Sequence, residues 1–153
     1  MKSLIQIERF HYEEPYNLDL AIHVCCGRQS GELEFYCSAD DLKRAGDELS
    51  KFPLDRNAEF LWELGSEKPE DNSAFYFCFR VYTEAVLGTR VIHVRFNNNE
   101  TLPEKQITEF CIRAEISKIN LLGELLQDFT KLQNQRLWWD TTKGALDDEE
   151  TRQ

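Results

Sequence analysis

Two histidines and three cysteines are the residues whose types best fit metal or thiol chemistry. If the segments that carry them are strands, strand alternation places all five on the side opposite the main apolar rows. The five residues are His23, Cys25, Cys78, His93 and Cys111. Two cysteines with one or two histidines form a ligand set for zinc, and a cysteine beside a histidine forms a nucleophile pair. A small metal- or thiol-dependent enzyme is therefore one hypothesis.

The rest of the sequence gives that chemistry little support. Most of the strands would contribute a single residue, whereas zinc sites usually contain a closely spaced pair of ligands. The chain has no GxxxxGK[ST], GxGxxG, GxSxG, HExxH or CxxC motif. No carboxylate stands in an apolar sequence context that predicts a raised pKa for acid–base work. Reduced, packed thiols are the commoner arrangement, and we expect no cofactor.

Three arginines share a predicted strand face with these residues, each two positions after a cysteine or histidine. Glutamates on that face would pair with the arginines across strands as a solvated charge ladder. The alternative is a mixed-charge docking face, because arginine and aromatic residues are frequent in binding hot spots. The candidate partner-binding residues are Arg80, Arg95, Arg113, Tyr76, Tyr82, Trp138 and Trp139.

Charge and composition restrict the partners. A formal net charge of −10 repels phosphate backbones, which disfavours nucleic acid and favours encounter with a basic protein. No segment approaches the roughly 18 consecutive apolar residues of a membrane span, and the start of the chain does not read as a signal peptide. The odd number of cysteines, 5, is a poor disulfide framework. We expect a cytoplasmic protein, monomeric or homodimeric, without membrane contact.

Seven segments have strand-like alternation, and two have helical spacing. The predicted strands cover residues 4–10, 18–25, 32–37, 58–65, 74–82, 89–96 and 107–116. Because the strands come in series of three and four, each followed by one helix, the pattern predicts an antiparallel α+β fold. We expect a meander sheet system, strongly twisted or sandwich-like, with both amphipathic helices on its apolar face.

The first predicted helix follows the stretch "CSADD". Ser38 is a good N-cap, and Asp41 can complete a capping box. Apolar residues then recur at helical spacing until Pro53 ends the helix. Ser117 is expected to cap the second helix in the same way.

Glycines lie inside both predicted helices, at Gly46 and Gly123. A glycine at such a position would let a helix lie close to the sheet, because it has no side chain.

Residues 1–132 are expected to form a single α+β domain, and residues 133–153 a C-terminal segment. Within that segment, Trp138 and Trp139 would dock on the body of the domain. The acidic end "DDEETRQ" has the composition of a disordered tail.

A series of motifs makes residues 16–132 resemble a group of small uncharacterised bacterial domains. The motifs are "GRQSGELEFYCSADDLKRAGDELSKFP", "FLWELGSE", "VIHVRFNNN" and the Leu-rich "LLGELLQDF". That group in turn is similar to the WapI-like immunity proteins, which are paired with wall-associated or contact-delivered toxins. The resemblance implies a non-enzymatic binding domain that steers and occludes a basic toxin domain, and it implies no catalytic residue. A self-assembling structural protein is a further alternative.

Overall fold

The computed structural model of the chain describes residues 2–10, 16–55, 57–84 and 88–148. These residues form nine strands, two α-helices and one short 3-10 helix, η1, at Pro69–Asp71. The helices are α1 (Ala39–Ser50) and α2 (Ile116–Phe129). The strands are β1 (Ser3–Phe10), β2 (Asn17–Cys26), β3 (Gln29–Ser38), β4 (Phe60–Gly65), β5 (Tyr76–Thr83), β6 (Arg90–Asn97), β7 (Ile107–Ala114), β8 (Arg136–Asp140) and β9 (Gly144–Asp147).

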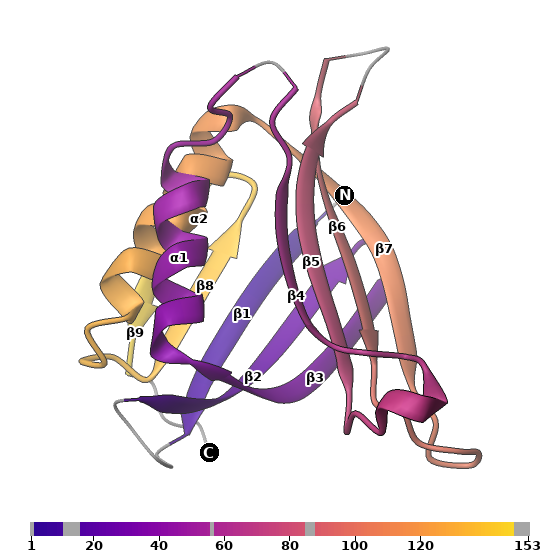
Figure 1. Cartoon of the computed structure of the whole chain (residues 1–153). Helices are drawn as coiled ribbons and strands as arrows, with labels where there is room; N and C mark the ends of the chain where they lie inside the picture. The colour runs from indigo at the N-terminus through magenta and orange to yellow at the C-terminus, as the bar shows by residue number, and fades with distance from the viewer. Residues whose placement is uncertain (1, 11–15, 56, 85–87, 149–153) are drawn as a thin grey trace.

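The strands form two antiparallel sheets. Sheet A has five strands in the order β3-β2-β1-β8-β9, and sheet B has four in the order β4-β5-β6-β7. Both predicted meanders are present, as β1-β2-β3 and as β4 to β7, and the α+β class is confirmed. Figure 1 shows that sheet B covers one part of sheet A, while α2 packs on β8 and β9, and α1 packs on α2 and reaches β3 and β4.

Strand alternation explains which side of each sheet is buried. In β2 the residues at every second position from Leu18 to Val24 are at most 1% exposed, and the residues between them face outward. Phe77 of sheet B stacks on Phe35 of β3 at 4.4 Å and on Phe96 at 5.5 Å between ring centroids. The apolar core therefore lies between the inner faces of the two sheets and beneath the helices.

Helix α1 begins and ends as predicted. The Ser38 hydroxyl accepts a hydrogen bond from the Asp41 amide at 3.0 Å, and the Asp41 carboxylate accepts one from the Ser38 amide. At the other end, Asn120 of α2 donates to the carbonyl groups of Leu49 and Phe52 at 2.9 and 2.8 Å. The Leu49 carbonyl also accepts from the Phe52 amide at 3.2 Å, so Asn120 adds a second donor there and ties the end of α1 to α2.

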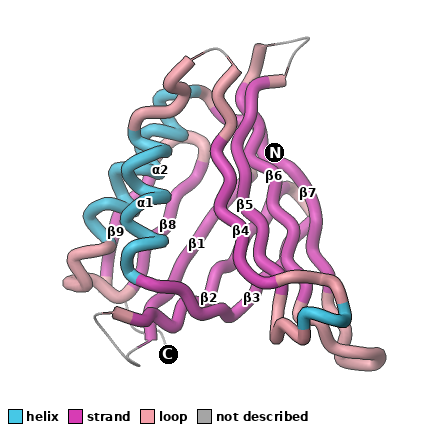
Figure 2. Tube along the Cα trace, viewed as in Figure 1, coloured by secondary structure: helices cyan, strands magenta, loops and turns pink. Residues whose placement is uncertain are grey.

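The predicted role of the two helix glycines is wrong. Gly46 and Gly123 let α1 and α2 approach each other, not the sheet. A Cβ on Gly123 would lie 2.1 Å from the Ser50 backbone nitrogen, and one on Gly46 would lie 2.8 Å from the Gln127 backbone nitrogen. The helices therefore form one tightly packed pair, which Figure 2 shows as two adjacent helices beside the strands.

The predicted N-cap of α2 is also wrong, because Glu115 and not Ser117 occupies that position. Strand β7 ends at Ala114, and Glu115 keeps extended backbone angles, with φ −79° and ψ 156°. Its carbonyl already accepts hydrogen bonds from the amides of Lys118 and Ile119, at 3.0 and 3.1 Å. The helix therefore begins directly where the strand stops, and Ser117 lies exposed in its first turn.

The segment after residue 132 contributes two strands that were not predicted. Strand β8 pairs with β1, and the side chain of Trp139 is fully buried. The Trp139 indole nitrogen donates to the Lys118 carbonyl at 2.8 Å, which joins sheet A to the first turn of α2. Sheet A thus extends beyond the predicted domain boundary to β9. The predicted disordered end falls mainly on residues 149–153, which lie outside the described residues.

No α-helix among the described residues is both long and apolar enough to cross a membrane.

Candidate functional site

The five histidine and cysteine residues grouped from the sequence lie on two different sheets. His23 and Cys25 lie on the outer face of sheet A, in β2. Cys78, His93 and Cys111 lie on the outer face of sheet B, where His93 is directly opposite Cys111. The five therefore do not meet at one point. No group of three or more His, Cys, Asp or Glu side chains in the described part of the chain is placed to hold a metal ion.

His93 is held between an arginine and a glutamate on sheet B. Arg80 Nε donates to His93 Nδ1 at 2.9 Å, and His93 Nε2 lies 2.7 Å from Glu109 Oε2. Because arginine can only donate, the proton of the neutral ring lies on Nε2 and is donated to Glu109. The hydrogen bonds from His93 and from Arg95 hold the pKa of Glu109 below its usual range. Both ring nitrogens are engaged, so neither is available to activate a thiol.

The thiols on this face are not arranged as nucleophiles. Burial raises the pKa of the Cys78 thiol, whose residue is only 6% exposed. Partial burial also raises the pKa of Cys111, although that residue is exposed overall. Because the thiolate is the reactive form, both shifts disfavour reaction at neutral pH.

Each of the three predicted arginines has a carboxylate partner. Arg95 contacts Glu67 and Glu109, with nitrogen–oxygen distances of 2.9 Å in both pairs. The other two pairs are Arg80–Glu59 at 3.0 Å and Arg113–Glu84 at 2.9 Å. We call this set of paired arginines, their glutamates and His93 the charge ladder. Its cations are compensated within the chain, as expected of a solvated sheet surface.

The predicted aromatic residues divide between three environments. Tyr82 lies beneath the Arg80 guanidinium, 4.5 Å from it, and the Tyr76 hydroxyl donates to Glu63, so both belong to the outer face of sheet B. Trp138 is half-buried on the outer face of sheet A, opposite Gln6. Trp139, being fully buried, lies in the core and away from any partner-binding surface.

The outer face of sheet A carries carboxylates that were not singled out from the sequence. Asp19 of β2 and Glu32 and Glu34 of β3 all point outward, and none of the three forms an ion pair with a described residue. Burial, followed by a hydrogen bond and charge repulsion from Glu34, raises the pKa of Asp19 to about 6. The expectation that no carboxylate would have a raised pKa is therefore wrong.

Aromatic side chains lie among these carboxylates. Phe10 of β1 is directly opposite Asp19, and Tyr36 of β3 is opposite Asp19 on the other side. The side chain of Tyr36 belongs to a residue that is 50% exposed, and Phe10 is partly exposed. We call this part of sheet A, which comprises Phe10, Asp19, Glu32, Glu34, Tyr36 and Trp138, the acidic face.

A groove of about 530 Å³ adjoins the acidic face. One wall comes from the outer side of β3 and includes Glu32, Glu34 and Tyr36. The opposite wall comes from segments of sheet B that flank its strands, and it includes Phe75 and Glu100. The groove is therefore lined by acidic and aromatic side chains, and no lysine or arginine is among its described lining residues.

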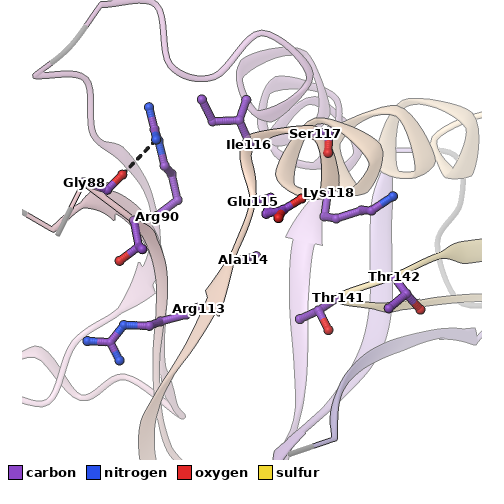
Figure 3. A pocket seen from close by; sticks show the side chains of 11 residues that line it. Gly88, Arg90, Arg113, Ala114, Glu115, Ile116, Ser117, Lys118, Thr141 and Thr142 are labelled. Atoms are coloured by element: carbon purple, nitrogen blue, oxygen red, sulfur yellow. Dashed lines mark hydrogen bonds between the residues drawn. The ribbon is translucent and has the colours of Figure 1, made fainter.

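A larger hollow, of about 930 Å³, lies near the first turn of α2 and is shown in Figure 3. Although Arg90, Arg113 and Lys118 contribute to its lining, Figure 3 shows their side chains pointing in three different directions. Arg90 donates to the Gly88 carbonyl at 2.9 Å, and Arg113 is paired with Glu84. The cations do not converge on one point, so the hollow lacks the geometry of an anion site.

No protein-family model, curated protein or solved structure matches the chain. The structure defines it as an α+β protein of two antiparallel sheets with a packed helix pair, carrying one charge-compensated outer face and one acidic outer face.

Proposed function

We propose that the chain is a protein-binding domain whose acidic face engages a basic partner. The observation that carries the proposal is the contrast between the two outer faces: each arginine of the charge ladder pairs with a glutamate, whereas Asp19, Glu32 and Glu34 of the acidic face form no ion pair with a described residue. With a net charge of −10, the chain attracts a basic protein over a distance and speeds the encounter. The neighbouring aromatic side chains then supply apolar contact area.

The more specific form of the proposal is an immunity protein of the bacterial cytoplasm. In this role the rigid sheet would cover the active surface of a basic toxin domain and block access to it. The resemblance of residues 16–132 to small bacterial domains, and through them to immunity proteins of the WapI-like type, supports this form. Occlusion requires no catalytic residue in the binding domain, which agrees with the engaged nitrogens of His93 and the raised thiol pKa values.

Site-specific photo-crosslinking in the source organism tests the binding surface. A benzophenone amino acid is placed at Gln6, which lies between His23 and Trp138 on sheet A, and separately at Leu61, which is 47% exposed on sheet B. We expect one basic protein to crosslink from position 6 and to be absent from the position 61 sample. Crosslinks only from position 61, or none from either position, would contradict the proposal.

Growth protection tests the immunity form. The chain is co-expressed with the product of each neighbouring reading frame that proves toxic on its own, either unchanged or as Glu32→Lys/Glu34→Lys; the absence of any toxic neighbour would also count against this form. We expect the unchanged chain to restore growth and the double variant to lose protection. Glu124→Lys/Asp128→Lys is the control, since it makes the same charge change on the exposed side of α2. Equal protection by both double variants, or no protection by the unchanged chain, would contradict this form.

A further inference from the structure

The imidazole ring of His93 lies in the middle of a series of polar contacts across sheet B. Arg80 Nε donates to His93 Nδ1 at 2.9 Å, and His93 Nε2 lies 2.7 Å from Glu109 Oε2. Arg80 also pairs with Glu59, with a nitrogen–oxygen distance of 3.0 Å. Glu109 in turn accepts a hydrogen bond from Arg95 at 2.9 Å. Within this series the ring links the arginine of β5 to the glutamate of β7.

The hydrogen bond from Arg80 depends on the charge state of the ring. In the neutral ring Nδ1 has a lone pair that accepts the arginine proton, whereas in imidazolium both nitrogens carry protons. Arginine keeps its own protons, so two N–H groups would then face each other. Turning the ring over does not restore the bond, because neither nitrogen of imidazolium can accept. A second proton on His93 therefore breaks the contact with Arg80, while the contact with Glu109 becomes an ion pair.

The ring is surrounded by charges of both signs. The titratable and charged side chains around it are Cys78, Arg80 and Tyr82 of β5, Arg95 of β6, Glu109, Cys111 and Arg113 of β7, Glu84 after β5, and Glu59, Glu63 and Glu67 on and beside β4. The arginines disfavour a second proton on the ring, and the glutamates favour it. Glu109 contacts the ring directly and would hold the added charge. Histidine is the type of side chain that ordinarily changes charge between pH 5 and 8, so this position is suited to sensing pH.

Arg80 keeps other contacts when it leaves the ring. Its guanidinium lies over the Tyr82 ring at 4.5 Å and contacts Glu59 at 3.0 Å. The Arg80 side chain is 34% exposed, so water can accept the proton that Nε no longer shares with the ring. Release therefore leaves no buried donor without a partner, and its cost is small.

We propose that His93 is a proton-operated switch that releases Arg80 from the charge ladder. With the neutral ring, the ladder is continuous from the segment before β4 to β7. With the charged ring, it divides into one part centred on Arg80 and another centred on Glu109. The outer face of sheet B then gains one positive charge and one arginine N–H that is open to water or to a carboxylate of a partner. This inference concerns sheet B and does not rest on the proposed function of the acidic face.

A ¹⁵N NMR titration of the full chain from about pH 7.5 to about pH 5 tests the switch. A hydrogen bond between two nitrogens produces a scalar coupling, here between Arg80 Nε and His93 Nδ1. We expect this coupling at the higher pH and its loss as the ring nitrogens take the chemical shifts of imidazolium. The Arg80 Nε–H signal should move with the same midpoint. Arg113 is the internal control, because its Nε donates to Glu84, and its signal should move less than about a third as far.

Two matched variants assign the response to one ring. His93→Gln removes the titrating group, so the Arg80 Nε–H signal should lose its dependence on pH over the same range. His23→Gln removes the histidine on the outer face of sheet A and should leave the response of Arg80 unchanged. The dispersion of each variant's amide spectrum shows that it is folded at every pH of the titration.

The proposal is overturned by any of four results. The first is the absence of nitrogen–nitrogen coupling at the higher pH, and the second is a ring that stays neutral until the protein unfolds. The third is an Arg80 signal that keeps its position while the ring becomes charged. The fourth is a response of Arg80 that persists in His93→Gln, because another group would then drive it.

Discussion

The outer faces of the two sheets differ in how their carboxylates are compensated. Both combine glutamates with tyrosine or tryptophan side chains. On the charge ladder, Arg80, Arg95 and Arg113 each pair with a carboxylate. On the acidic face, Glu32 and Glu34 have no cationic partner among the described residues.

This contrast teaches that residue types alone do not identify a binding surface. Arginine and tyrosine are typical of hot spots, yet on sheet B they are already engaged with each other and with glutamates. A partner at the charge ladder would have to replace existing ion pairs, whereas a basic partner at the acidic face would add new ones.

The largest expected effect concerns the charge ladder. Arg95→Met leaves Glu67 and Glu109 without their shared cation, and Glu67 keeps only the hydrogen bond from Asn97. We expect the free energy of unfolding at pH 7 to fall by about 2 kcal/mol, as measured by urea denaturation. Lys43→Met, which removes an exposed i,i+4 pair with Asp47, is the control and should cost less than about 0.5 kcal/mol. Equal losses in the two variants would show that the ladder is not a coupled network.

A substitution on the acidic face should have the opposite sign. The pKa of Asp19 rises from 3.8 to about 6 on folding, so the folded state holds this proton more tightly than the unfolded state does. Stability is therefore lost as the pH rises from about 4 to above 6, where the folded carboxyl becomes charged. Full linkage would give about 3 kcal/mol, and partial solvation of the carboxyl reduces our expectation to about 1 kcal/mol.

Asp19→Asn removes that charge. We expect it to stabilise the protein by about 1 kcal/mol at pH 7 and to have little effect at pH 4, as measured by urea denaturation at both values. Glu124→Gln, an exposed carboxylate of α2, should show no such difference between the two pH values. Destabilisation of Asp19→Asn at pH 7 would show that the acidic face is compensated after all.

The smallest expected effect concerns His93. In ¹⁵N NMR of the neutral ring we expect the proton on Nε2, because Arg80 donates to Nδ1. His93→Gln should lower the free energy of unfolding by only about 0.5 kcal/mol, since the ring lies in an otherwise intact ladder. A proton on Nδ1 would be incompatible with the hydrogen bond from Arg80.

Much of the fold could be predicted from local patterns. Alternation over 18–25 and 32–37 located a hairpin, and Ser38 with Asp41 located the start of α1, because both signals act between near neighbours in the chain. Strand β8 was missed since "RLWWD" is only five residues long, and its place beside β1 depends on a contact across the whole chain. The N-cap at Glu115 was missed because a strand that runs directly into a helix leaves no separate capping signal.

The candidate site was harder to predict because it depends on which strands are neighbours. Parity correctly placed His23 and His93 on outward faces, but it could not show that those faces belong to different sheets. Part of the acidic face could be predicted from the sequence, because Asp19 and Glu34 occupy outward positions of one hairpin. The wall of the adjoining groove that carries Phe75 could not be predicted, because it comes from segments that flank the strands of sheet B.

The central claim is that the arginines of sheet B are compensated by glutamates, whereas Asp19, Glu32 and Glu34 on the acidic face of sheet A have no cationic partner among the described residues. A carbon-detected NMR titration of every carboxyl group in the native protein tests it most directly. We predict that Asp19 titrates near pH 6, and that Glu67 and Glu109 titrate below the usual range of glutamate. An Asp19 that titrates near 4, together with Glu67 and Glu109 at ordinary values, would contradict the claim and remove the basis for a basic partner on the acidic face.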